Sequence, residues 1–445
     1  MTSGKDNVID PDRTAAAVKA MYRNDPEREW HRMARHRMEF AISLRALKDH
    51  LPAPPAAILD CGGGPGRYAM TLTQQGYDVT LFDLSPELLQ LARDRSAEAG
   101  VTLDGLEEGT ATDLSRFADA SFDAVLLMGP LYHLLDQADR ERALTEARRV
   151  VKPGGPVFAA FISRYAGHID AVADYPAEAL EQLEAFDRIE TTGLQPPRED
   201  GQIAFVAYFA HPSEIRPLCR HAGLEVQTVL GVEGVCSLRE EKINALQGEA
   251  WDQWVEINYR IAHDPCTHGG VEHLLAVCHR PRWRAVLHRV ARALSESGID
   301  YRLVGSAALA LHGVDVPVHD LDLEMAKEDA QRLLAQFEAH IVLPLAWREA
   351  EDIRSHYGRL EVDGVGVDVM AGLERRVRGH WVPSLCTSGT TVDLDGTQIR
   401  LLEVEEEALS QMRRGRLDTA ATALPSCDHD RLLERLAEAQ SQGWI

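Results

Sequence analysis

Short, mainly apolar runs alternate with helix-like segments between residues 56 and 163. The runs at 56–60, 78–83, 122–128 and 156–163 have the composition of strands that are buried on both faces. The segment 86–100 between two of them is amphipathic, with Pro86 near its start and Gly100 at its end, as in a helix. Buried strands separated by helices predict a doubly wound α/β domain with a parallel, Rossmann-like sheet.

The flanking segments extend this first domain. Residues 1–50 are predicted to be helical, because Trp30, Met33, Met38 and Phe40 recur at helix-like spacing. The polar, acidic segment 164–202 is predicted to be a helical insertion, and 164–211 to form a substrate lid over a pocket. Further strands are expected at 202–209, 224–232 and 272–278. We therefore place the first domain at 1–281.

A second pattern starts after this boundary. A helix is predicted at 283–297, a strand at 299–305, a helix at 306–313 and a strand at 319–325. The dipeptide Asp363-Gly364 between 359–362 and 365–369 is a strong hairpin-turn signal. Residues 282–445 are therefore predicted to form a second, smaller α/β domain.

Composition narrows the possible partners. The chain has 445 residues and a net charge of -23, which argues against a nucleic-acid partner because such proteins normally present a basic face. The polar N-terminus does not resemble a signal peptide, and no apolar run approaches the roughly 20 residues that span a bilayer. We expect a cytoplasmic protein without membrane contact that acts on a small-molecule substrate, and the oligomeric state stays open.

The loop that follows the first strand carries the clearest chemistry. Asp60-Cys61-Gly62-Gly63-Gly64-Pro65-Gly66 joins a strand to a helix. Glycines let the backbone turn sharply and approach a ligand, and the helix N-terminus offers unpaired N–H groups. Such a loop also occurs in dinucleotide-dependent oxidoreductases, so by itself it leaves both classes of enzyme open.

Three further blocks distinguish these classes. Asp83 ends the second strand about 20 residues after Asp60, a spacing at which a carboxylate can bind ribose hydroxyls. Asp113 and Leu114 follow the third strand region, where an aspartate could accept a hydrogen bond from an adenine amino group. The segment 150–155, VVKPGG, precedes the last of the four strands.

The blocks LDCGGGPG, LFDLS, ATDL, FDAVLLMGPLYHL and RRVVKPGG stand in this order along the chain. Together they resemble the class I S-adenosylmethionine-dependent methyltransferases, and most of all a branch with GPLYHL after the fourth strand. The resemblance covers roughly residues 20–280 and implies a seven-stranded sheet whose last strand is antiparallel.

The same resemblance implies a set of cofactor-binding residues. Asp60 and three loop glycines would line the methionine and ribose side, and Asp83 would hold the ribose hydroxyls. Asp113 and Leu114 would hold the adenine, and Met128 and Gly129 would pass beneath the cofactor. The full set is Asp60, Gly62, Gly64, Gly66, Asp83, Leu84, Asp113, Leu114, Met128 and Gly129.

Methyl transfer needs a base only where the acceptor must lose a proton. His133 and Tyr132 directly follow the fourth strand, and His133 is the candidate base; the alternative is that it only packs or caps a turn. Weaker candidates for the acceptor pocket come from the leading helix, the insertion and the following strand. They are Tyr22, His36, Tyr165, Tyr208 and His211.

The second domain carries a separate set of acidic residues. Asp320 and Asp322 alternate with apolar Leu321 and Leu323, so both carboxylates face the same side of a strand. Carboxylates that lie together repel one another without a cation, which predicts a Mg²⁺ site. Asp368, on a later hairpin strand, would add a third carboxylate.

The second domain resembles the nucleotidyltransferase superfamily. The resemblance is carried by Gly305-Ser306 after one strand, an Asp-x-Asp motif on the next strand and a single Asp on a third. The resemblance implies that Gly305 and Ser306 touch the phosphates of a nucleoside triphosphate and that Asp320 and Asp322 bind metal. Asp368 would bind metal or act as a base. Val318-His319 departs from the usual residues before the first Asp. Two hypotheses follow: a bifunctional enzyme, or a methyltransferase whose second domain is an inactive binding or regulatory module.

Overall fold

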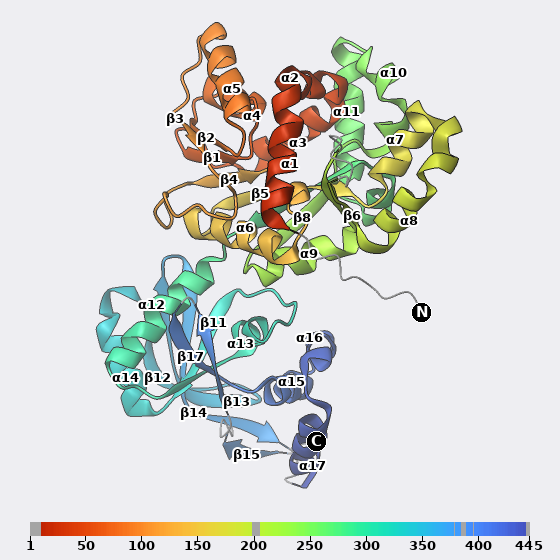
Figure 1. Ribbon diagram of the computed structural model, residues 1–445. Helices are drawn as coiled ribbons and strands as arrows, with labels where there is room; N and C mark the ends of the chain where they lie inside the picture. Colours follow the sequence, from red (N-terminus) through yellow and green to blue (C-terminus); the bar gives the residue numbers. More distant parts are fainter. Residues whose placement is uncertain (1–9, 198–204, 378, 384–388, 395, 442–445) are drawn as a thin grey trace. The chain divides into compact units, whose positions relative to one another are not determined.

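The computed structural model describes residues 10–197, 205–377, 379–383, 389–394 and 396–441. The chain divides into two compact units, Met1–Arg280 and Pro281–Ile445 (Figure 1). Among the described helices, none is both long and apolar enough to cross a membrane. Part of the strand predicted at 202–209 falls at 202–204, outside the described residues.

The first unit is built on a mixed sheet with the order β3-β2-β1-β4-β5, continued on one side by β9 and β8. The strands β1 to β5 pair in parallel, and β9 runs antiparallel to both β5 and β8. This arrangement confirms the predicted Rossmann-like fold with an antiparallel last strand. The strands are β1 (Ala57–Cys61), β2 (Asp78–Asp83), β3 (Gly105–Glu108), β4 (Ala124–Leu127), β5 (Pro156–Ser163), β6 (Leu194–Gln195), β7 (Ala207–Ala210), β8 (Glu225–Gly231) and β9 (His273–His279).

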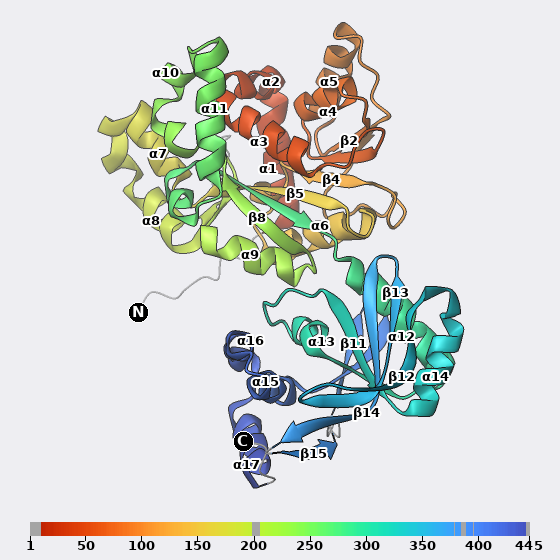
Figure 2. The ribbon, with the colours of Figure 1, turned by 180° about the vertical axis from the view of Figure 1, so that it is seen from behind.

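Helices cover both faces of this sheet (Figures 1 and 2). Apolar side chains of α6 and α9 pack on one face, and those of α3, α4, α5 and α11 on the other, so the strands are buried from both sides. The helices are α1 (Pro11–Asn24), α2 (Pro26–Arg35), α3 (Arg37–His50), α4 (Arg67–Gln74), α5 (Pro86–Glu98), η1 (Leu131–His133), α6 (Gln137–Val150), α7 (Ala166–Asp174), η2 (Pro176–Gln182), α8 (Leu183–Thr192), α9 (Pro212–His221), η3 (Gly234–Arg239), α10 (Glu240–Asn244), α11 (Gly248–Ala262) and η4 (Pro265–Gly270).

The segment after β5 differs from a plain Rossmann-like sheet. The insertion is helical, as predicted, and consists of α7, η2 and α8. It ends in the short strand β6, which pairs with β7, and β7 in turn pairs with the last residues of β5. The described sheet therefore has nine strands rather than the seven that were predicted.

The second unit is a mixed eight-stranded sheet in which β11 lies between β10 and β14. Leu321 and Leu323 of β11 are fully buried beneath α12 and α14. The predicted hairpin forms at Asp363-Gly364, and both residues have positive φ. The strands are β10 (Tyr301–Val304), β11 (Asp320–Met325), β12 (Ile341–Glu349), β13 (Ile353–Val362), β14 (Val365–Val377), β15 (His380–Pro383), β16 (Thr390–Leu394) and β17 (Thr397–Leu401).

The helices of the second unit form two groups. The first group, α12 and α14, shares a core with the sheet, and α13 forms a small second core with α15 and α16 (Figure 2). The helices are α12 (Arg282–Glu296), α13 (Gly305–Leu311), α14 (Lys327–Gln336), η5 (Glu338–His340), α15 (Val404–Arg413), α16 (Leu417–Ala423), η6 (Leu424–Ser426) and α17 (His429–Ser441).

Candidate functional site

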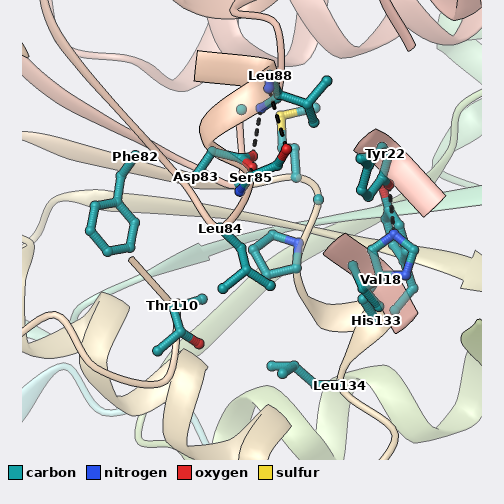
Figure 3. Close-up of a pocket in the computed structure, with 18 of the residues that line it drawn as sticks. Val18, Tyr22, Phe82, Asp83, Leu84, Ser85, Leu88, Thr110, His133 and Leu134 are labelled. Atoms are coloured by element: carbon teal, nitrogen blue, oxygen red, sulfur yellow. Dashed lines mark hydrogen bonds between the residues drawn. The ribbon is translucent and has the colours of Figure 1, made fainter. Parts of the chain in front are cut away.

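A cavity opens at the carboxyl ends of β1, β2 and β4 in the first unit (Figure 3). Parallel strands place their following loops at one edge, which is where open α/β sheets bind ligands. Helix α1 contributes one wall through Val18 and Tyr22, and η1 contributes Tyr132 and His133. The predicted cofactor residues that line it are Asp60, Gly62, Gly64, Asp83, Leu84, Met128 and Gly129.

The glycine-rich loop is shaped by contacts that leave no room for side chains. Gly62 has φ +72°, and a Cβ there would lie 2.4 Å from Cδ of Pro130. A Cβ on Gly129 would lie 2.3 Å from the Gly62 carbonyl oxygen. Gly66 is left-handed and caps the N-terminus of α4, although it does not itself line the cavity. The loop and the segment after β4 therefore need glycine to pass this close to each other.

Asp60 ends up as a buried carboxylate in the cavity wall. It has no exposed surface, and among the described residues no donor makes a well-formed hydrogen bond to either of its oxygens, although the backbone N–H of Ala69 weakly favours its ionised form. Burial, with a smaller contribution from Asp83, raises the pKa of Asp60 to about 7. A buried carboxylate without a partner is costly, and a cationic group in the cavity would satisfy it.

Asp83 ends β2 and is held in place by backbone donors. Its two oxygens accept hydrogen bonds from the N–H groups of Gly64 and Ser85, each at 2.8 Å. The next helix has its own cap, because the Leu88 N–H donates to Ser85 Oγ (Figure 3). Burial raises the pKa of Asp83 to about 6 despite these donors. Asp83 is therefore positioned beside the glycine loop, where its remaining lone pairs can accept from hydroxyl groups.

His133 and Tyr22 are hydrogen-bonded to each other in the cavity wall, although they are far apart in the sequence (Figure 3). Nδ1 of His133 lies 2.7 Å from the carbonyl oxygen of Val206, so Nδ1 carries the proton and donates. Nε2 is then the acceptor, and it receives the Tyr22 hydroxyl at 2.7 Å. Burial lowers the pKa of His133 to about 4, so the ring is neutral near pH 7.

The structure does not bring the predicted adenine contacts to the cavity. Asp113 is exposed and accepts the Ser115 N–H, while Leu114 is fully buried and its N–H donates to Glu146. The neighbouring residues Thr110 and Ala111 line the cavity in their place. The motif thus leads to a loop that lines the cavity, and the residues facing the cavity lie three positions earlier.

Of the five predicted acceptor-pocket residues, only Tyr22 lines this cavity. Tyr208 donates its hydroxyl to Glu214, and His211 caps α9. Tyr165 is exposed at the start of α7, and His36 forms an ion pair with Glu240. The described part of 164–211, predicted as the lid, contributes no lining residue; the wall that the lid was expected to form comes from α1.

The second unit brings its three predicted carboxylates together. Asp322 on β11 is the register partner of Asp368 on β14, and Asp320 stands two residues away on the same face. Burial, followed by the charge of Asp320, raises the pKa of Asp322 to about 7. Arg359 supplies a counter-charge, with Nη1 3.1 Å from Asp368 and 3.8 Å from Asp320.

The predicted phosphate contact of this unit is only partly available. The Gly305 N–H already donates to Glu407 of α15, at 2.9 Å, in a buried position. Gly305 has φ +76°, and a Cβ there would lie 2.3 Å from Oδ2 of Asp322. Gly305 therefore packs against Asp322, and a phosphate would have to use Ser306 and the groups after it.

Comparison with known proteins agrees with the geometry of the first unit. Residues 58–155 match a family described as a methyltransferase domain. A ubiquinone biosynthesis O-methyltransferase of Xylella fastidiosa is 30% identical over 192 residues, which are 43% of this chain and 70% of that protein. The chain belongs to the S-adenosylmethionine-dependent methyltransferases. The ubiquinone biosynthesis O-methyltransferase of Xanthomonas axonopodis is 29% identical over 222 residues, which are 50% of this chain and 82% of that protein.

The second unit of the methyltransferase matches another family. Residues 286–419 match aminoglycoside-2''-adenylyltransferase. Among solved structures, a candidate nucleotidyltransferase from Thermotoga maritima is 29% identical, with a TM-score of 0.30, and covers 32% of this chain and 91% of its own. A methyltransferase from Methanosarcina mazei is 20% identical, with a TM-score of 0.38, and covers 53% and 97%. The family match over residues 286–419 confirms the predicted nucleotidyltransferase-like domain as a domain type.

Sequence reasoning missed several residues in the wall of the methyltransferase cavity. Arg32 and Glu29 of α2 line it, and Arg32 Nε donates to Glu29 at 3.0 Å. Arg67, next to Gly66, also lines it and lies over the Trp30 ring at 4.1 Å. The position of Arg67 after the loop was a usable signal, whereas nothing local indicates that α2 packs against the cavity.

Proposed function

We propose that the first unit transfers the methyl group of S-adenosylmethionine to an oxygen atom of a small-molecule acceptor. The observation that carries this proposal is a single cavity that contains both an unpartnered buried carboxylate, Asp60, and an imidazole nitrogen in its acceptor form, Nε2 of His133. Oxygen as the acceptor atom is favoured by the similarity to O-methyltransferases.

The chain's residues fit this cofactor at several points. Asp60 would pair with its ammonium group and Asp83 would accept from its ribose hydroxyls. Arg67 would meet its carboxylate, and Thr110 with Ala111 would border its adenine. When bound, S-adenosylmethionine supplies an electrophilic methyl group, so the protein's task is to align the acceptor and to exclude water.

His133 would take the proton from the acceptor hydroxyl. Its Nδ1–H is committed to the Val206 carbonyl, which orients the ring and leaves Nε2 as the basic atom. In the structure the Tyr22 hydroxyl donates a hydrogen bond to Nε2. Burial raises the pKa of Tyr22 well above its ordinary value, so the hydroxyl stays protonated and remains a donor. An acceptor hydroxyl would displace the Tyr22 hydroxyl or donate through it.

A labelling experiment tests this proposal. The chain is incubated with S-adenosylmethionine carrying a labelled methyl group, and with separate pools of small metabolites, DNA and RNA. We expect label in the small-molecule pool as a methyl ether. Label on nitrogen would contradict oxygen as the acceptor atom, and label confined to nucleic acid would contradict a small-molecule acceptor.

We propose for the second unit a Mg²⁺-dependent transfer of a nucleotidyl group, which would make the chain bifunctional. Support comes from the three carboxylates on adjacent strands and from the match to an adenylyltransferase family. Two metal ions held in this way would bind a triphosphate and orient an attacking hydroxyl. The alternative is an inactive binding module, favoured by the Arg359 counter-charge and the occupied Gly305 N–H.

Nucleotide titration separates these alternatives. ATP, GTP, CTP and UTP are titrated into the full chain with and without Mg²⁺, with saturating S-adenosylhomocysteine to fill the first cavity. We expect Mg²⁺-dependent binding that is lost in Asp320→Asn/Asp322→Asn and kept in Glu328→Gln, an exposed acid of α14. Negligible binding by the unaltered chain would reduce this unit to a module without nucleotide chemistry.

A further inference from the structure

An arginine shares one face of the second sheet with the three carboxylates of this unit. The strands β11, β14 and β13 lie side by side in that order (Figure 2). Asp322 on β11 is the register partner of Asp368 on β14, which in turn pairs with Arg359 on β13. Because register partners on adjacent strands point to the same face, the arginine stands in one row with two of the acids.

The guanidinium of Arg359 leans from this row toward the third acid. Its Nη1 lies 3.1 Å from Asp368 and 3.8 Å from Asp320. The register partner of Asp320 on β14 is Gly366, where a Cβ would overlap Nη2 of Arg359. A side chain at position 366 would therefore exclude the guanidinium, and glycine leaves room for it between the two carboxylates.

Asp368 is bonded through both of its oxygens in this arrangement. The Tyr357 hydroxyl donates to Oδ1 at 2.9 Å, and Nη1 of Arg359 donates to Oδ2 at 3.3 Å. Tyr357 stands two residues before Arg359, on the same face of β13, so one strand supplies both donors. The strand β13 thus holds the carboxylate of Asp368 in the absence of any ligand.

The donor set fits a magnesium ion, which binds carboxylate oxygens together with the phosphates of a substrate. Asp320 and Asp322 share one face, and Asp368 stands beside Asp322 on the next strand. Such acids repel one another without a cation. Arg359 reduces this repulsion, and Arg414, after α15, adds a positive charge that acts on Asp322. Arg359 therefore lies where a metal ion bound to Asp320 and Asp368 would also lie.

A guanidinium and a metal ion compete for the same carboxylate oxygens, since both are cations. Arg359 is free to give way, because 38% of its side-chain surface is exposed and a long side chain can turn without a change in the fold. A triphosphate that arrives with Mg²⁺ offers it new partners. Arginine binds phosphate oxygens through two parallel N–H donors, which makes phosphate a good replacement for the carboxylates it leaves.

We propose that Arg359 exchanges partners when a nucleotide binds: it neutralises Asp320 and Asp368 in the free protein, and it binds the triphosphate once Mg²⁺ has taken its place. This role rests on the proposed nucleotidyl transfer, and it accounts for a counter-charge that would otherwise favour an inactive module. Metal ions alone should then bind weakly, and the metal ion and the triphosphate should strengthen each other's binding.

Two titrations of Arg359→Gln test this exchange, because they should change in opposite directions. Mn²⁺ is titrated alone into the full chain, with free Mn²⁺ measured by electron paramagnetic resonance, and only the binding that Asp320→Asn/Asp322→Asn abolishes is counted. Whichever of ATP, GTP, CTP and UTP binds most tightly is then titrated with saturating Mg²⁺ and S-adenosylhomocysteine. We expect Mn²⁺ to bind roughly tenfold more tightly, since a competing cation is gone, and the triphosphate roughly tenfold more weakly.

Two further variants serve as controls. Arg354→Gln removes an equivalent ion pair between the same two strands, with Glu374, and should change neither titration. Arg359→Lys keeps the charge but loses the two parallel donors. It should leave Mn²⁺ binding as weak as in the unaltered chain, and its affinity for the triphosphate should lie between those of the unaltered chain and Arg359→Gln.

Other results would overturn the exchange. Loss of both affinities in Arg359→Gln would make Arg359 a structural partner of Asp368, and two unchanged affinities would make the ion pair incidental. Tighter Mn²⁺ binding with unchanged triphosphate binding would leave Arg359 as a counter-ion that never meets the nucleotide. Negligible triphosphate binding by the unaltered chain would instead contradict the proposed nucleotidyl transfer itself, and the exchange with it.

Discussion

Replacing His133 by alanine is expected to lower turnover by roughly 10²–10⁴-fold, the range for a lost general base, while S-adenosylhomocysteine affinity stays nearly intact. The structure supplies the reason: Nδ1 is bonded to the Val206 carbonyl, so Nε2 faces the cavity as the only basic atom of the ring. Turnover is measured with the acceptor found by labelling, and cofactor affinity by calorimetry.

Tyr22→Phe is the matched control for this variant. It removes the hydroxyl that occupies Nε2 but keeps the ring that lines the cavity. If His133 takes the proton directly, Tyr22→Phe should change turnover by less than about tenfold, below the effect of a lost base. Unchanged turnover in His133→Ala would instead assign the histidine to packing between η1 and the segment at Val206.

Asp60→Asn is expected to weaken S-adenosylhomocysteine binding by roughly 10- to 150-fold, which corresponds to about 1.5–3 kcal/mol for a lost charge-assisted hydrogen bond. The free protein should not lose stability, because the buried carboxylate has no hydrogen-bond partner among the described residues. Thermal unfolding without ligand therefore separates the two roles. A large drop in Tm with unchanged affinity would make Asp60 a structural residue.

The pH dependence of binding follows from the same carboxylate. Burial raises the pKa of Asp60 to about 7 in the free protein, whereas pairing with an ammonium group requires the ionised form. Binding should therefore release a proton, and affinity should fall as the pH decreases through 7. Asp60→Asn should flatten this pH dependence near pH 7. A weaker decrease in affinity should remain at lower pH, because the pKa of Asp83 is raised to about 6.

Local patterns were sufficient to predict the parallel sheet, the glycine loop and the acidic strand of the second unit. Each depends on residues close together in the sequence: Asp83 is fixed by the end of its strand, and Asp322 by alternation along β11. The sequence placed Asp368 on a later strand, but its register opposite Asp322 is set by the pairing of β11 with β14. Such features are readable because strand ends and side-chain alternation follow from backbone geometry.

Contacts between distant segments were not predictable in this way. Helical spacing shows which face of α1 is buried, but not that Tyr22 meets His133. The same holds for Arg32 beside Glu39 and His273, and for Glu407 at the Gly305 N–H. Asp113 was predicted to face the cavity, but its side chain is exposed and does not line it. A motif places a residue in a loop without deciding whether its side chain faces the cavity or the solvent.

The central claim is that the first unit binds S-adenosylmethionine through Asp60 and Asp83. Calorimetric titration of the unaltered full chain with S-adenosylhomocysteine, and separately with NAD, tests it most directly. The account predicts saturable binding of S-adenosylhomocysteine, weakened by Asp83→Ala by about 1.5–3 kcal/mol, and no binding of NAD. Absence of S-adenosylhomocysteine binding at millimolar concentration, or tight binding of NAD in its place, would contradict it.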